Sequence, residues 1–245
     1  MGLVQKDAFR TMIISYVGII LGYLNKGLLF LLILSTEEIG LVNLIFYFGM
    51  LFAQFANLGT VYTTWKFLPF FKNKEKKHHG FLPLMLLIVC LGILICTSLL
   101  LIFRPSIEAL YLEKSPLFVS YFIWIIPIGV AYVMYMVLDI YLRGFYKNIV
   151  SVIALEIVTR VAMTILLFLI WMKTISFDTF VIGQSLIYFI PTIILVAYLY
   201  KMNELNLSFR SIKVSKRFKK IILQFSAFNY INTLGAVLVN SLDVI

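Results

Sequence analysis

The chain has 245 residues, of which 62% are hydrophobic and only 13% are charged, and its formal net charge is +10. A water-soluble fold of this length cannot bury so much apolar surface, which excludes a globular soluble protein and indicates a polytopic membrane protein. The basic residues lie between apolar segments and form no single patch, which is typical of a membrane topology signal and speaks against nucleic-acid binding.

Six long apolar segments follow one another along the chain. Each is long enough to cross about 30 Å of hydrocarbon as a helix of roughly 20 residues. Cys90 and Cys96 lie in the third segment on different helix faces, so neither a disulfide nor a metal pair is predicted. The predicted spans are 8–34, 39–64, 81–103, 116–139, 149–172 and 177–200.

The distribution of lysine and arginine predicts the orientation. Most of them lie at the N-terminus or in the second, fourth and sixth connections between spans. The first, third and fifth connections together contain only Arg104, Lys114 and Lys173. Because basic connections remain on the cytoplasmic side, the N-terminus is predicted to be cytoplasmic.

A seventh apolar segment follows the most basic stretch of the chain and stops without a flanking charge. Its end, 232–243, aligns weakly with 15–26 in the first span and places Asp243 opposite Lys26. Transporters built from two repeats begin both halves alike, so we expect a fragment or truncated product that lacks most of its second half. The expected parts are a six-helix lobe (1–200), a basic cytoplasmic interfacial linker (201–220) and the first helix of a second lobe (221–245).

Ionisable residues inside the spans are the main functional candidates, because a charge in the bilayer is costly. Lys26 lies about 24 Å beyond Arg10 along a helix, in the far half of the membrane. One hypothesis is that it faces a water-filled cavity and binds an anionic group, or pairs with Asp243. The alternative is that it extends outward to the far interface. Asn25 beside it adds polarity, which favours the cavity.

Two acid–base pairs have the four-residue spacing that places side chains on one helix face. Glu156 and Arg160 lie near the middle of the fifth span. They are either a self-neutralising structural pair or a substrate and proton-coupling site, and the sequence favours neither. Asp139 and Arg143 lie at the cytoplasmic end of the fourth span. Water is near there, which favours a structural ion pair over a coupling role.

The remaining polar residues and the prolines give weaker indications of function than the charged residues within the spans. His78 and His79 are expected to be solvated in a cytoplasmic loop, where no cysteine or acidic cluster completes a metal site. Pro127 and Pro191 lie mid-span and predict kinks. No nucleophile motif, phosphate-binding loop or paired-carboxylate arrangement is present. We therefore expect no metal, no cofactor and no enzymatic activity.

Three short segments carry a family resemblance: 36–44 (TEEIGLVNL), 53–59 (AQFANLG) and 65–72 (WKFLPFFK). They resemble the first hairpin, and the connection that follows it, of bacterial polysaccharide biosynthesis proteins of the oligosaccharide flippase type. The basic link before a seventh span is similar too. This family belongs with the MATE-like exporters and the lipid II flippases.

The resemblance implies two six-helix lobes around a central cavity, alternating access, and a location in the cytoplasmic (inner) membrane. It implies export of a polyprenyl-diphosphate-linked oligosaccharide for cell-surface polysaccharide such as O-antigen or capsule. Its implied partners are this lipid-linked substrate, membrane lipids and polysaccharide assembly proteins. The lipid II branch carries an Arg-Asp pair in the first span, where this chain has Asn25-Lys26. That difference argues against the lipid II branch.

On this hypothesis Lys26 and Arg160 attract the diphosphate, Asn25 and Gln184 contact sugars, and Glu156 or Asp243 couples transport to an ion. The nearest alternative is a drug or cation antiporter of the same fold, in which a buried carboxylate dominates the cavity. A membrane-embedded acyltransferase or polymerase is an alternative of another class. The absence of an intramembrane histidine and of a large outer loop argues against it. A structural membrane subunit is also compatible with the sequence.

Overall fold

The computed structural model describes residues 3–75, 77–208 and 216–242, and the regular structure in these ranges is helical throughout. The predicted all-α polytopic bundle is therefore confirmed, whereas the division into two MATE-like lobes stays a prediction. Residues 209–215 of the predicted interfacial linker, and Asp243, lie outside the described residues. Six helical segments in these ranges are long and apolar enough to cross a membrane: Gln5–Ile33, Thr36–Ala56, His78–Tyr111, Pro116–Arg143, Asn148–Trp171 and Phe177–Lys201.

Most of these segments are built from two or three shorter helical pieces. The first comprises α1 (Leu3–Tyr23), the π-helical turn η1 (Leu24–Leu29) and α2 (Phe30–Ile33). The second is α3 (Thr36–Ala56), which is followed by α4 (Thr60–Phe71) and the short turn η2 (Lys77–Gly80). The third is α5 (Phe81–Tyr111), and the fourth joins α6 (Pro116–Tyr121), η3 (Phe122–Trp124) and α7 (Ile125–Arg143).

The fifth and sixth segments are also interrupted, and one more helix follows them. The fifth comprises α8 (Asn148–Val152), the π-helical turn η4 (Ile153–Val158) and α9 (Thr159–Trp171). The sixth comprises α10 (Phe177–Ile187) and α11 (Phe189–Lys201), and α12 (Lys216–Leu242) comes last.

The second span is shorter than the continuous segment 39–64 that the apolar pattern predicts. It begins at a capping box, in which the Ser35 hydroxyl accepts from the Glu38 amide and the Glu38 carboxylate accepts from the Ser35 amide. It ends at Ala56, because residues 57–59 form a turn. The side-chain oxygen of Asn57 accepts from the Gly59 amide, and Gly59 has φ +74°. From this turn α4 continues as a separate helix.

The regular α-helix is interrupted just before Pro127 and just before Pro191, the positions at which kinks are predicted. In the fourth span the tight turn η3 lies one helical turn before Pro127. In the sixth span the helix is interrupted at Tyr188, between α10 and α11, just before Pro191. A proline ring collides with the carbonyl four residues earlier and removes one backbone hydrogen bond, so the helix loosens on that side.

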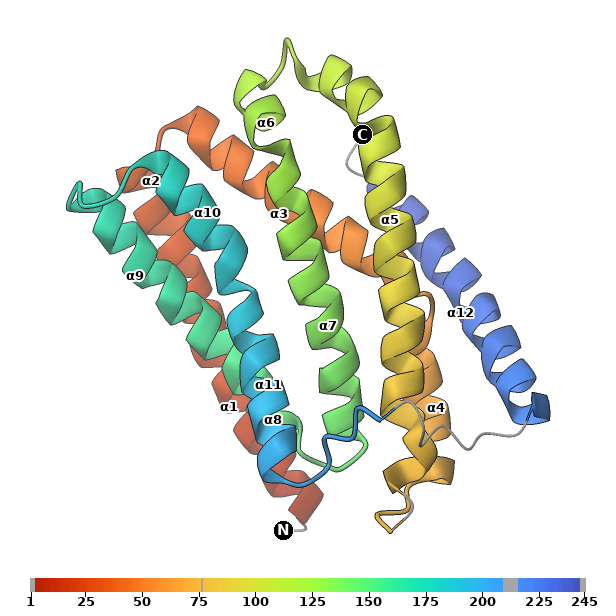
Figure 1. Cartoon of the computed structure of the whole chain (residues 1–245). Coiled ribbons are helices and arrows are strands. Elements are labelled where there is room, and N and C mark those ends of the chain that lie inside the picture. The colour runs from red at the N-terminus through yellow and green to blue at the C-terminus, as the bar shows by residue number, and fades with distance from the viewer. Residues whose placement is uncertain (1–2, 76, 209–215, 243–245) are drawn as a thin grey trace.

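The arrangement of the helices brings the basic connections together (Figure 1). The N-terminus and the connections 72–80, 144–147 and 202–208 lie at the same end of the bundle, at the bottom of the view. In the centre α7 stands between α5 on one side and α10 and α11 on the other, and the tilted α3 packs along it. This topology agrees with the alternation of basic and non-basic connections. Which side of the membrane each end faces stays a prediction.

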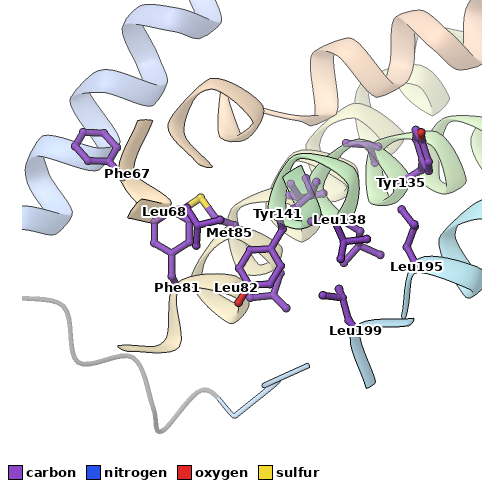
Figure 2. Close-up of a cluster of buried hydrophobic side chains, with 14 of the residues drawn as sticks. Phe67, Leu68, Phe81, Leu82, Met85, Tyr135, Leu138, Tyr141, Leu195 and Leu199 are labelled. Carbon is purple, nitrogen blue, oxygen red and sulfur yellow. The ribbon is translucent and has the colours of Figure 1, made fainter. Parts of the chain in front are cut away.

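A large apolar cluster joins six helices near this end of the bundle (Figure 2). Its side chains come from α3, α4, α5, α7, α11 and α12 and are nearly all inaccessible to solvent. Such close packing fixes these helices against one another. Labelled members of the cluster are Phe67, Leu68, Phe81, Leu82, Met85, Tyr135, Leu138, Tyr141, Leu195 and Leu199.

The close approach of α5 to the end of α3 gives a stability prediction. A β-carbon at Gly92 would overlap the backbone carbonyl oxygen of Ala56 and lie 3.1 Å from the Leu58 side chain. We expect Gly92→Ala to lower the free energy of unfolding by about 1–3 kcal/mol, since backbone cannot move aside as a side-chain tip can. Gly40→Ala is the matched control, because nothing lies within 4 Å of its added carbon. Chemical unfolding in detergent measures the free energy of unfolding of both variants. Equal values for Gly92→Ala and Gly40→Ala would contradict the close packing at Gly92.

Candidate functional site

Two neighbouring helices are each widened by a π-helical turn beside an intramembrane charge. Lys26 lies within η1 of the first span, and Glu156 lies within η4 of the fifth. The two spans pack against each other, since α1 contacts η4 and α9 contacts η1. Such turns often occur at functional sites because they change the direction of the side chains that follow. The apolar pattern of the sequence does not predict these π-helical turns.

A cavity of ≈ 520 Å³ lies between these turns and the helices opposite them. Its volume falls within the range of small-molecule sites. Its charged residues are two cations and one carboxylate, so the lining carries a net positive charge. The residues that line it are Ile19, Gly22, Tyr23, Asn25, Lys26, Phe30, Phe46, Tyr132, Leu155, Glu156, Thr159, Arg160, Met163 and Tyr188.

Two hydrogen bonds hold the Arg160 guanidinium in place. One guanidinium nitrogen bonds the Glu156 carboxylate, and the other donates to the backbone carbonyl of Gly18 on α1. Gly22 makes room for this arrangement, because a β-carbon there would overlap the guanidinium. The two side chains of the pair are only 29% and 26% exposed. The predicted i,i+4 pair therefore forms, and it also joins the fifth span to the first.

Asn25 lines the cavity, but its polar atoms are bonded to the protein. The residue is only 3% exposed. Its amide nitrogen donates to the Arg160 carbonyl at 2.8 Å, and its oxygen accepts from the Thr164 hydroxyl at 2.7 Å. Asn25 thus fastens η1 to α9, and the sugar contact predicted for it stays a prediction.

Lys26 differs from Arg160 in having no carboxylate beside it within the described residues. Its ammonium donates to the Asn43 side-chain oxygen at 3.2 Å and lies 4.8 Å from the centre of the Phe46 ring. Both partners are on α3, so the side chain joins η1 to that neighbouring helix. The predicted pairing with Asp243 is not tested, because Asp243 lies outside the described residues.

Gln184 is not among the residues that line this cavity, and its predicted contact with sugars stays a prediction. It is 3% exposed, and its amide nitrogen donates to the Val42 carbonyl at 3.4 Å. Its side-chain oxygen has no hydrogen-bond partner among the described residues. Gln184 therefore lies between α10 and α3, packed within the protein.

Asp139 and Arg143 form the second predicted pair, with 2.9 Å between Oδ2 and Nε. They lie near the end of α7 and are absent from the cavity lining. The Ser151 hydroxyl of α8 faces the Asp139 carboxylate, although neither Asp139 Oδ1 nor Ser151 Oγ has a partner at hydrogen-bond distance in the described part of the chain. This placement agrees with the structural interpretation of the pair.

Sequence reasoning missed several lining residues and the environment of one histidine. The aromatic rings of Phe46, Tyr132 and Tyr188 line the cavity, but nothing in the apolar spans distinguishes them from lipid-facing aromatics. His78, which was predicted to be solvated, is only 4% exposed and bonds Glu204. Within the described ranges, no three His, Cys, Asp or Glu residues gather as metal ligands.

Comparisons with known proteins add no assignment to this geometry. No protein-family model, no curated protein and no solved structure matches the chain. Two features of the molecule bear on its function: a multi-pass helical bundle, and a cavity lined by Lys26, which has no carboxylate partner among the described residues.

Proposed function

We propose that the chain forms part of a membrane exporter of lipid-linked oligosaccharides, of the oligosaccharide flippase type within the MATE-like superfamily. The observation that carries the proposal is Lys26, an ammonium inside a membrane-embedded cavity with no neighbouring carboxylate in the described residues. An intramembrane charge is retained only where it has a use or a partner. A cation in such a place suits an anionic substrate.

The substrate group that fits Lys26 best is the diphosphate of a polyprenyl-diphosphate-linked oligosaccharide. A lysine ammonium is a compact charge with three donors, and it binds phosphate oxygens as a point charge. Asn43 and Phe46 orient the ammonium without neutralising it. Arg160, held by Glu156 and by the Gly18 carbonyl, adds its positive charge to the cavity.

The remaining lining suits the sugar portion of such a substrate. Rings from four of the six spans line the cavity, including Tyr23, Phe46, Tyr132 and Tyr188. Aromatic residues offer an apolar face, and tyrosine adds a hydroxyl that can donate or accept a hydrogen bond. A pocket that combines apolar faces with a few polar groups matches the general character of small-molecule sites.

In the proposed setting the protein lies in the cytoplasmic membrane with its N-terminus in the cytoplasm. Lipid carrying the oligosaccharide then passes from the inner to the outer leaflet by alternating access. Partners are the lipid-linked substrate, membrane lipids and enzymes that assemble the surface polysaccharide. The basic connections at one end of the bundle support the orientation.

A drug or cation antiporter is the competing proposal, and the charges in the cavity oppose it. Such a transporter needs a carboxylate free to bind the cation, whereas Glu156 is engaged by Arg160. Two cations against one carboxylate repel a cationic drug. No described residue therefore favours this second function over the first.

The test is deletion of the complete reading frame, followed by complementation. We expect surface polysaccharide to fall at least tenfold. Lipid-linked oligosaccharide is expected to accumulate in the cytoplasmic leaflet. There, a membrane-impermeant glycosidase added outside intact cells cannot reach it. The intact gene restores both. Normal polysaccharide together with greater sensitivity to cationic drugs would replace the proposal by the antiporter.

A further inference from the structure

The turn between α4 and α5 has an unusual backbone that its surroundings hold in place. His78 and His79 have φ of 48° and 51°, and Gly80 has φ 69°, so three successive residues are left-handed. Residues with a β-carbon rarely adopt this conformation, and it persists where neighbouring structure fixes it. Here the His78 amide donates to the Asn73 carbonyl at 2.8 Å, which closes the turn.

The hydrogen bonds of His78 define which nitrogen carries its proton. Its Nδ1 accepts from the Asn73 backbone amide at 3.1 Å, so the proton of a neutral ring lies on Nε2. Nε2 donates to Glu204 Oε2 at 2.5 Å. The ring is 4% exposed, and its edge packs on the Phe145 ring at 5.3 Å between centroids.

Glu204 lies in the connection that leaves α11, far from His78 in the sequence. It is 8% exposed, and its second oxygen is 3.5 Å from the Lys74 ammonium. The same carboxylate therefore binds two residues of the turn after α4. A nearly buried carboxylate needs such partners, because burial without them is costly.

The chain returns to the same hairpin after this connection. α12 packs against α4, where the Ser226 and Thr63 hydroxyls lie 2.6 Å apart. Phe225 and Phe218 pack edge-on against Phe67 at 5.4 and 5.7 Å between ring centroids. The connection from α11 to α12 is thus anchored at Glu204 to the turn after α4, and α12 is anchored to α4 itself.

We propose that His78 and Glu204 form a clasp that fastens the exit of α11 to the α4–α5 hairpin, so that this exit, the hairpin and α12, which packs on α4, move as one unit. The clasp does not depend on which substrate is transported. Movement between parts of the bundle is then expected elsewhere than among the exit of α11, the α4–α5 hairpin and α12.

Hydrogen exchange in the intact protein in lipid nanodiscs tests the clasp. We expect His78→Ala and Glu204→Ala to raise the exchange rates of backbone amides in 72–80 and 202–208 at least tenfold. His79→Ala and Glu75→Ala are matched controls of the same residue types in the same turn, and Glu75 is exposed. Their exchange rates are expected to stay within twofold of those of the unmodified protein. Equal rates in clasp and control variants would overturn the clasp.

Cross-linking in native membranes, without purification, tests whether the clasp also restrains α12 on α4. Thr63→Cys with Ser226→Cys, in a chain with Cys90 and Cys96 changed to serine, is expected to form a disulfide rapidly. Adding Glu204→Ala is expected to slow disulfide formation at least threefold, because α12 is then less restrained. An unchanged rate would show that the clasp does not hold α12 on α4.

Discussion

Replacement of Lys26 by alanine is expected to reduce export of lipid-linked oligosaccharide by roughly ten- to hundredfold while the protein still inserts and folds. A charge-assisted hydrogen bond contributes about 1.5–3 kcal/mol, and this energy corresponds to such a loss. Stability is expected to stay equal or to rise, because the ammonium has no carboxylate partner in the described residues. Surface polysaccharide and membrane-inserted protein are the two measurements.

The controls separate a role of the charge from a general effect of mutation. Lys26→Arg keeps a cation and is expected to retain a substantial part of the export activity. Lys173→Ala removes an exposed lysine from the connection between α9 and α10, outside the cavity lining, and is expected to leave export unchanged. Normal export by the Lys26→Ala variant would remove the main support for an anionic substrate.

The spans could be predicted because apolar length is a strong and local signal. The prolines at 127 and 191 also act locally, on the preceding turn of their own helices, so interruptions of the helix at these places could be foreseen. The end of the second span was misplaced since the apolar pattern continues beyond Ala56. The turn at Asn57–Gly59 depends on an amide side chain and a left-handed glycine, and the apolar pattern gives no signal for either.

Part of the candidate site was also predictable, because charges within apolar spans are few. Lys26, Glu156 and Arg160 stand out in the sequence, and the structure brings all three to one cavity. The π-helical turns could not be foreseen, since they arise where two spans pack closely. Nor could the burial of His78, whose partner Glu204 lies 126 residues away in another basic connection.

The pair of Glu156 and Arg160 tests whether a second intramembrane cation acts on substrate or only on structure. Arg160→Ala is expected to lower the free energy of unfolding by about 3 kcal/mol, since it leaves a largely buried carboxylate without its partner. The double variant Glu156→Gln with Arg160→Gln is expected to recover most of this loss, because no unpaired charge remains.

Export by the double variant then decides between the two roles. The guanidinium is bonded to Glu156 and to the Gly18 carbonyl, so we expect its main task to be joining the fifth span to the first. The double variant is therefore expected to export within threefold of the unmodified protein, in contrast to Lys26→Ala. If stability returns but export does not, the pair itself contacts the substrate or couples its movement to an ion, and the anion site extends from Lys26 to Arg160 across the cavity.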